Sequence, residues 1–227
     1  MELRYRPRAR TTRDIDLSVP SPARSGSAAA RLAAVRDELQ EAADREMGDF
    51  LKYRIGAPSR ELQGAPLGGG RFPCQAVLAG KVYTRFHIDL GFGDPLLGQP
   101  EQLVGDDLLT FADIAPPAVL AIPRTQQFAE KVHAYTFAWG DRENSRTRDL
   151  VDLVLLIECD MQLEEVRAAL QATFDARKTH AVPSTFPRPP EAWREEFETM
   201  ANEIGLRVAS LDEAFQELVA FWDRVGV

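Results

Sequence analysis

The sequence predicts an α+β fold, with a small α/β layer first and a helical bundle after it. Two observations predict this order. Between residues 81 and 90, apolar and polar residues alternate with a period of two, as in a strand with one buried face. After about Pro117 the apolar residues recur at helical spacing instead. We therefore expect an α/β core over residues 1–117 and a helical domain over residues 118–227.

The beginning of the core is expected to form a strand and then a helix. The segment DIDLSV alternates, so Asp14 and Asp16 share one face of a short strand and the apolar residues share the other. The segment PSPARSGS ends this strand, because proline cannot donate to a β-ladder. Ser25 or Ser27 is then expected to cap a helix over residues 28–47.

The strongest strand signals follow this helix. Residues 50–56 are expected to form a strand, and the Gly- and Pro-rich residues 64–73 a loop. A pair of strands comes next, over residues 75–80 and 81–92. The longer strand has an apolar face and a polar face, and the polar face carries Asp89.

Helices are expected throughout the second part of the chain. The segment SRTRDLVDLVLLIE is apolar nearly all round, so we expect that helix to be largely buried. Pro190 is a suitable opening residue for one of the later helices. The expected helices cover residues 123–136, 145–158, 163–177, 190–205 and 210–225.

The composition excludes several classes of protein. A net charge of −8 and a pI near 5.0 argue against a general nucleic-acid coat protein. The arginine-rich start indicates either contact with RNA phosphates or a solvated basic segment. Cys74 and Cys159 cannot build a disulfide scaffold or a four-thiolate zinc site, and they favour a reducing compartment. There is no apolar run of the roughly 20 residues that cross a bilayer, and no secretory signal. We therefore expect a cytoplasmic protein with no membrane association.

The residues most indicative of chemistry are Asp14 and Asp16. Two carboxylates on one strand face repel each other unless a cation lies between them. Mg²⁺ prefers such oxygen ligands. If the strand that carries Asp89 lies beside DIDLSV, three carboxylates converge, as metal-dependent phosphoryl or nucleotidyl transfer requires. The alternative is a polar strand edge in solvent.

A second group of charged residues falls on the expected helices. Asp149 and Asp152 lie one turn apart on an otherwise apolar helix, and burying a carboxylate without a partner costs several kcal/mol. Each therefore needs a cation, and Arg146, Arg148 and Lys131 are the candidates. A structural ion-pair network explains these residues about as well as a catalytic one.

Other residues carry weaker signals. His87 shares a strand face with Asp89 and is interpreted as a surface histidine, and Asp94 in GFGD as a turn residue. His133 and His180 lack the spacing of a zinc motif. The segment GAPLGGG lacks the ending of a phosphate-binding P-loop.

Four motifs occur in the order TTRDIDL, FHIDLGFGD, FAEKVHAYT and RTRDLVDL, followed by PPEAWREEFETMA and SLDEAF. Together they resemble the AbiEii/AbiGii-type nucleotidyltransferase toxins of the DNA polymerase β-like superfamily, over nearly the whole chain. The resemblance implies a small mixed β-sheet nucleotidyltransferase core followed by a C-terminal helical bundle. It also implies a Mg²⁺-dependent toxin that transfers NMP from an NTP to an acceptor such as the tRNA 3′ end. A cognate antitoxin protein is the implied partner.

The resemblance assigns the chemistry to two groups of residues. Asp14, Asp16 and Asp89 match catalytic residues that are also the Mg²⁺ ligands. Lys131 matches a catalytic lysine that contacts the nucleotide phosphates, and Asp149 matches a further acid that members of the family need.

The nucleotide-binding set implied by the resemblance is Lys131, Arg148 and Asp152, the last also being the alternate to Asp149. The superfamily signature begins with a Gly-Gly or Gly-Ser pair whose backbone N–H groups approach the triphosphate. Here that pair would fall before Met1, so we expect an N-terminally shortened core or a natural start upstream. The departure keeps a second interpretation open, a catalytically degenerate module that binds a nucleotide or a partner.

Overall fold

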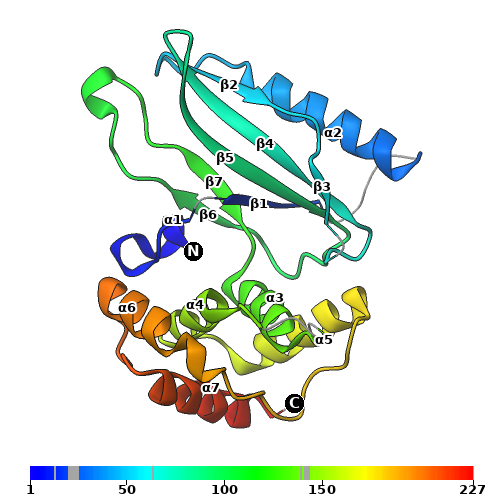
Figure 1. Cartoon of the computed structure of the whole chain (residues 1–227), viewed down its shortest axis with the longest axis vertical. Coiled ribbons are helices and arrows are strands. Elements are labelled where there is room, and N and C mark those ends of the chain that lie inside the picture. The colour runs from blue at the N-terminus through cyan, green and yellow to red at the C-terminus, as the bar shows by residue number, and fades with distance from the viewer. Residues whose placement is uncertain (13, 20–25, 63, 139, 141–143, 227) are drawn as a thin grey trace. The chain divides into compact units, whose positions relative to one another are not determined.

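A computed structural model describes residues 1–12, 14–19, 26–62, 64–138, 140 and 144–226 of the chain (Figure 1). Ser25, one of the two expected helix caps, lies outside these residues. The chain divides into two compact units. The sheet unit consists of Thr12–Pro95 and Gly105–Pro117, and the helical unit consists of Met1–Thr11, Leu96–Val104 and Ala118–Val227. Two stretches of the expected core, residues 1–11 and 96–104, are therefore part of the helical unit.

The sheet unit is built on one mixed sheet, as the predicted fold class requires. Its strands run in the order β1-β5-β4-β2, with β3 beside β4. β1 is parallel to β5, and the other pairs are antiparallel. The bounds are β1 Asp14–Val19, β2 Leu51–Ile55, β3 Arg60–Glu61, β4 Gly69–Leu78 and β5 Lys81–Phe92.

The two faces of this sheet differ in the way the alternation predicts over the second half of β5, whereas Val82 at its start and Ile15 and Leu17 of β1 are exposed. Ile88 and Leu90 are buried on one face, together with Phe72 of β4. This face packs against α2 (Ala28–Ala43) through Leu32 and Val35 (Figure 1). The polar face of β5 is the opposite one, because side chains alternate across a strand. The helix ends at residue 43, four residues before the expected end.

Ser27 caps α2, as one of the two alternatives predicted. Its side-chain oxygen accepts a hydrogen bond from the backbone N–H of Ala30 at 3.2 Å. The bond satisfies one of the backbone donors that have no partner at a helix start.

The expected loop over residues 64–73 is wrong in its second half, because β4 begins at Gly69. The reason is close packing. A Cβ at Gly69 would lie 2.2 Å from the carbonyl oxygen of Leu90, and a Cβ at Gly70 would lie 2.7 Å from Cδ2 of Leu32. These glycines therefore let the backbone of β4 approach β5 and α2, which is an alternative to the turn that glycine usually signals.

We expect Gly69→Ala to destabilise the protein by about 1–3 kcal/mol, since the added methyl meets backbone that cannot move aside cheaply. Urea unfolding of the whole chain measures this. Gly64→Ala is the matched control, because a Cβ at Gly64 meets nothing within 4 Å. An equal loss in both variants would contradict the packing explanation.

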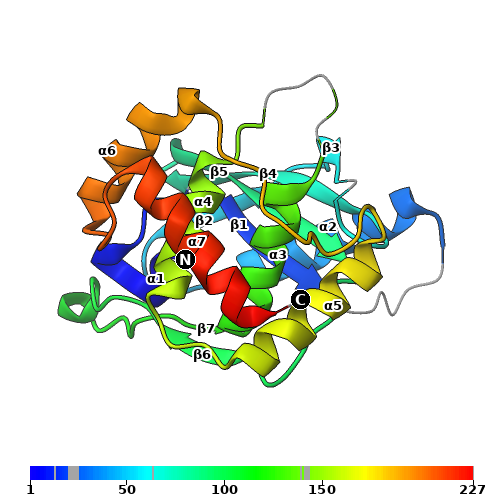
Figure 2. The ribbon, with the colours of Figure 1, turned by 90° about the horizontal axis from the view of Figure 1, so that it is seen from below.

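The helical unit contains the helices expected after residue 117. They are α3 (Arg124–Thr136), α4 (Thr147–Ile157), α5 (Leu163–Arg177), α6 (Arg194–Ile204) and α7 (Leu211–Val225). α4 contacts α3, α6 and α7, and it is buried over most of its length, as predicted (Figure 2). Among the described helices, none is long and apolar enough to cross a membrane.

Several short elements accompany these helices and strands. The helical unit also contains α1 (Glu2–Tyr5) and the antiparallel pair of β6 (Glu101–Val104) and β7 (Ala118–Ala121). Short 3-10 turns occur at Arg6–Arg8, Thr110–Ala112 and Glu191–Trp193. These elements are three or four residues long, too short for a hydrophobic period to show.

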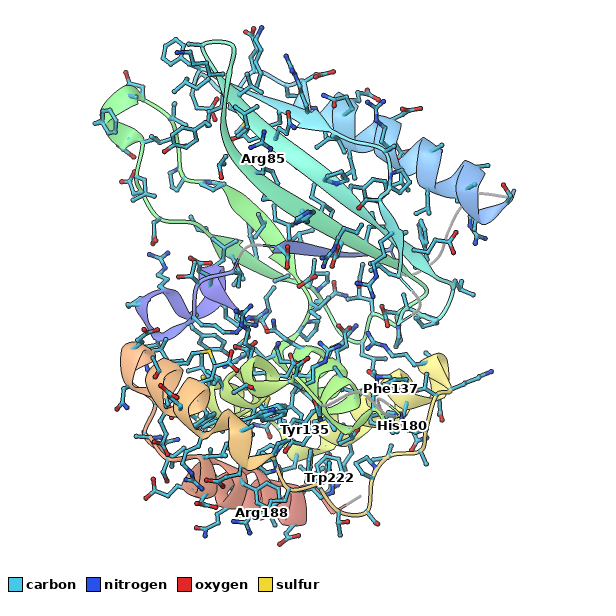
Figure 3. All side chains as sticks on the ribbon, viewed as in Figure 1. Arg85, Tyr135, Phe137, His180, Arg188 and Trp222 are labelled. Carbon is cyan, nitrogen blue, oxygen red and sulfur yellow. The ribbon has the colours of Figure 1, made fainter. Side chains whose placement is uncertain are left out.

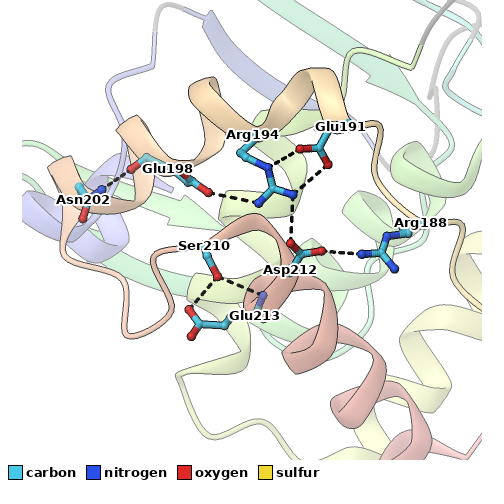
Figure 4. Close-up of polar contacts among 8 residues, drawn as sticks. All are labelled: Arg188, Glu191, Arg194, Glu198, Asn202, Ser210, Asp212 and Glu213. Carbon is cyan, nitrogen blue, oxygen red and sulfur yellow. Dashed lines mark hydrogen bonds and ion pairs between the residues drawn. The ribbon is translucent and has the colours of Figure 1, made fainter.

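A network of charged side chains joins α6 to the start of α7 (Figure 4). Arg194 contacts Glu191 and lies 3.0 Å from Asp212, and Arg188 lies 2.5 Å from the other oxygen of Asp212. Ser210 caps α7 by accepting from the N–H of Glu213. Because these side chains are solvent-accessible, each pair contributes little to stability.

A buried histidine, His133, lies among aromatic rings in the helical unit. Two of these rings, Phe137 and His180, are labelled in Figure 3. His133 is 5% exposed, and its Nε2 lies 2.7 Å from Oγ1 of Thr179. Its ring centre is 5.0 Å from that of Phe174. Burial lowers the pKa of His133 to about 3, and the positive charge of Arg177 adds to the effect.

We expect the free energy of unfolding to fall as the pH drops below about 6.5. His133 is then protonated in the unfolded chain, whereas in the folded chain it stays neutral down to about pH 3. The loss from this residue is on the order of 2 kcal/mol by pH 5. Urea unfolding at pH 7, 6 and 5 measures it. His133→Gln should flatten this pH dependence, whereas His87→Gln, on the exposed strand face, should leave it steep. A wild-type slope in His133→Gln would contradict the assignment.

Candidate active site

The predicted neighbourhood of three acids is confirmed by the sheet register. In the parallel β1–β5 pair, Asp16 lies opposite Asp89 and Asp14 lies opposite His87. Paired residues of adjacent strands point to the same face, with the strands about 4.8 Å apart. The three carboxylates therefore share the sheet face that points away from α2.

Asp89 is bound by an arginine from the neighbouring strand. Arg71 lies opposite Asp89 in the antiparallel β4–β5 pair. Its Nε donates to Oδ1 at 2.7 Å and its Nη2 donates to Oδ2 at 2.6 Å. The hydrogen bonds to Asp89 raise the pKa of the guanidinium, and the charges of Asp14 and Asp16 add to this. All three acids therefore act on one arginine.

The other two acids are more accessible. Asp14 is 43% exposed in its side chain, and its Oδ1 lies 3.5 Å from Nδ1 of His87. Asp16 is also exposed. Asp94, interpreted from the sequence as a turn residue, is 4% exposed, and its Oδ2 lies 3.4 Å from where a Cβ of Gly91 would be. A second carboxylate of the FHIDLGFGD motif is thus buried close to the sheet.

A divalent cation fits the chemistry of this face in part. Asp14 and Asp16 offer the accessible oxygen donors that Mg²⁺ prefers. Both oxygens of Asp89 are occupied by Arg71. Across the described residues, no three His, Cys, Asp or Glu side chains are grouped so that they could hold a metal ion. The expected three-carboxylate set is therefore brought together on one face, but Asp89 is turned to an arginine.

The second predicted group meets in the helical unit, where α3 packs against α4. Nζ of Lys131 lies 3.1 Å from Oδ1 of Asp149 and 2.6 Å from Oδ2 of Asp152. Arg146 also contacts Asp149, at 3.3 Å. Burial alone would lower the pKa of Lys131, but the two carboxylates outweigh it and raise that pKa. The lysine is therefore held in its charged form. Arg148 lies on the exposed side of α4.

Arg10 is a member of this cluster that sequence reasoning missed. Its Nη2 donates to Oδ2 of Asp152 at 2.8 Å, and Asp152 is 0% exposed. Arg4 lies 2.5 Å from Glu101, and Arg8 contacts Glu158. Three arginines of the chain start are thus bound to carboxylates of the helical unit. Arg6 and Arg8 are nevertheless exposed, so part of this segment is solvated as one alternative expected, and contact with RNA stays a prediction.

Sequence reasoning missed two residues of these clusters, and only Arg10 had a detectable signal. Arg71 lies in the stretch interpreted as a loop, so its place on a strand opposite Asp89 was hidden. Arg10 was noted for its charge, and the unpaired acids of the apolar helix were a reason to look for such a partner.

The comparisons with known proteins agree with these motifs. The model of one protein family, described as "Nucleotidyl transferase AbiEii toxin, Type IV TA system", matches residues 1–220. Among solved structures, the chain is similar to MenT4, a nucleotidyltransferase toxin of Mycobacterium tuberculosis H37Rv. The TM-score is 0.53 at 15% identity, covering 98% of this chain and 78% of that chain, which is a similarity of fold. No curated protein matches. The chain belongs to the AbiEii nucleotidyltransferase toxin family and is the toxin enzyme of a toxin–antitoxin system.

Proposed function

We propose that this toxin transfers a nucleoside monophosphate from an NTP to the 3′ end of tRNA in a Mg²⁺-dependent reaction. The acceptor oxygen forms a bond to the α-phosphorus, the bond from the α-phosphorus to the bridging oxygen breaks, and pyrophosphate leaves. The observation that carries the proposal is the register of Asp16 opposite Asp89, with Asp14 on the same face of the sheet.

Asp14 and Asp16 are the carboxylates that would hold the cation, and Asp89 is the third. Mg²⁺ would supply charge neutralisation at the α-phosphate. The exposure of Asp14 lets its carboxylate reach a ligand from solvent, and a carboxylate of this group accepts the proton of the acceptor hydroxyl. His87 beside Asp14 provides a second hydrogen-bonding group on the same face.

In the helical unit, Lys131 contacts nucleotide phosphates in this proposal, and Asp149 is the carboxylate that orients it. The side chain of Lys131 is 16% exposed, and its ammonium group is bound by both carboxylates. Its protonated state is secured by Asp149 and Asp152. Arg148, exposed on α4, adds a positive charge for the nucleotide. Substrate and acceptor place this activity in the cytoplasm, with the cognate antitoxin as protein partner.

The test is incorporation of each of the four α-labelled NTPs into bulk tRNA with Mg²⁺. We expect label from one NTP in the tRNA fraction, and none when the label is on the γ-phosphate, because that phosphate leaves with pyrophosphate. Label in protein instead of tRNA would contradict the acceptor. Tight NTP binding without any incorporation would favour the second interpretation, a nucleotide-binding module.

A further inference from the structure

Arg71 and Asp89 form an ion pair on the acidic face of the sheet, and what we infer from this pair rests on the proposed function. Both carboxylate oxygens of Asp89 accept hydrogen bonds from the guanidinium of Arg71. Its side chain is only 16% exposed. A carboxylate so poorly hydrated needs a cation at all times, because an unpaired charge there costs several kcal/mol.

Two cations therefore compete for the carboxylate of Asp89. One is the resident guanidinium of Arg71, and the other is a divalent ion bound at Asp14 and Asp16. The two cations cannot bind the same oxygens at once. Nε of Arg71 already donates to one oxygen of Asp89, and Nη2 donates to the other. A divalent ion gains Asp89 as a ligand only when at least one of these bonds opens.

The released guanidinium would not lack a partner. Arg71 is 31% exposed in its side chain, so its head has room to turn toward a ligand at the sheet surface. A guanidinium presents paired N–H donors that match phosphate oxygens as well as they match a carboxylate. An NTP brings such oxygens together with its divalent ion.

We propose that Arg71 exchanges partners: it holds Asp89 in the absence of the divalent cation, and it binds the nucleotide's triphosphate once the cation has taken Asp89. Arg71 is then a competitor of the cation and a ligand of the nucleotide. If Arg71 only held Asp89 in place, removing it would weaken both cation and phosphate binding. The exchange requires the two affinities to change in opposite directions.

The experiment is a pair of titrations on the full chain, with Mn²⁺ as the cation probe and inorganic triphosphate, at saturating Mn²⁺, as the phosphate probe. In Arg71→Gln we expect the Mn²⁺ affinity to rise about tenfold, because the positive charge that repels the cation and competes for Asp89 is gone. The triphosphate affinity should fall about tenfold, because a charged hydrogen-bond donor is lost. Arg71→Lys keeps the charge without the fork, so triphosphate binding should fall while the Mn²⁺ affinity stays nearer the wild-type value.

Arg85→Gln is the matched control, because it removes the same charge from the same sheet face. Arg85, labelled in Figure 3, lies on β5 an even number of residues from Asp89. Four residues along the strand place it about 13 Å from Asp89, beyond the screening length, so both affinities should change less than about twofold. A Mn²⁺ affinity in Arg71→Gln that equals that of Arg85→Gln, or falls below it, overturns the exchange.

Asp16→Asn separates this inference from the function on which it rests. If Asp16→Asn removes Mn²⁺ binding while Arg71→Gln behaves like Arg85→Gln, only the exchange is wrong. If Asp16→Asn binds Mn²⁺ as the wild type does, the cation does not bind at the acidic face, and the proposed function and the exchange are both overturned.

Discussion

Asp16→Asn is expected to lower the rate of nucleotide transfer by about 10²–10³-fold, the loss typical of removing a group that stabilises charge in the transition state. The amide is nearly isosteric with the carboxylate but has no negative charge to hold a divalent cation beside Asp14. Asp16 lies opposite Asp89 on the neighbouring strand and two residues from Asp14, so it is the central acid of the three. Single-turnover transfer of labelled NMP measures the effect.

The fold of Asp16→Asn should remain intact, because Asp16 is exposed and surface substitutions change stability by less than about 1 kcal/mol. Urea unfolding checks this. The control is Asp37→Asn, a carboxylate on α2 whose side chain is 73% exposed and pairs with Arg36. Full activity in a folded Asp16→Asn protein would show that the acidic face takes no part in catalysis.

Lys131→Met is expected to lower both stability and nucleotide transfer. The substitution leaves the fully buried Asp152 with Arg10 as its remaining cation, and breaking a buried ion pair costs about 3–5 kcal/mol. We expect a loss near the lower end, about 3 kcal/mol, because Arg10 and Arg146 still face the two acids. Urea unfolding of the variant measures this loss.

Transfer should fall at least about 10²-fold per folded molecule if Lys131 also contacts phosphates, since a charged contact in the transition state is lost. Arg177→Met is the control, because it breaks a partly buried pair with Glu130 in the same unit, 3.7 Å apart, outside the proposed site. Normal transfer by the folded fraction of Lys131→Met would show that the cluster of Lys131, Asp149 and Asp152 has only a structural role. That outcome corresponds to the alternative that the sequence left open.

The sheet face that carries the acids could be predicted because its signal is local. Period-two alternation in residues 81–92 identifies which side chains share a face, and the same rule places Asp14 beside Asp16. No local pattern in the sequence shows that β1 and β5 are neighbouring strands. The order of the family motifs made it a reasonable expectation, and the register confirmed it.

What sequence reasoning missed depends on contacts between distant residues. Gly69 and Gly70 look like a turn until Leu90 and Leu32 are seen against them. The misassigned strand then hid Arg71. Charge at the chain start was visible, but its partners lie far away in the sequence, such as Asp152 for Arg10, 142 residues later. Long-range ion pairs leave no period to detect.

The central claim is that this toxin adds a nucleotide to the 3′ end of tRNA with a divalent cation held by the acidic face. The most direct measurement compares α-labelled NTP incorporation into intact tRNA and into tRNA whose terminal ribose has been oxidised with periodate. Each is incubated with Mg²⁺ or with EDTA. The account predicts label only in intact tRNA with Mg²⁺. Equal label in the oxidised tRNA, or label that persists in EDTA, would contradict it.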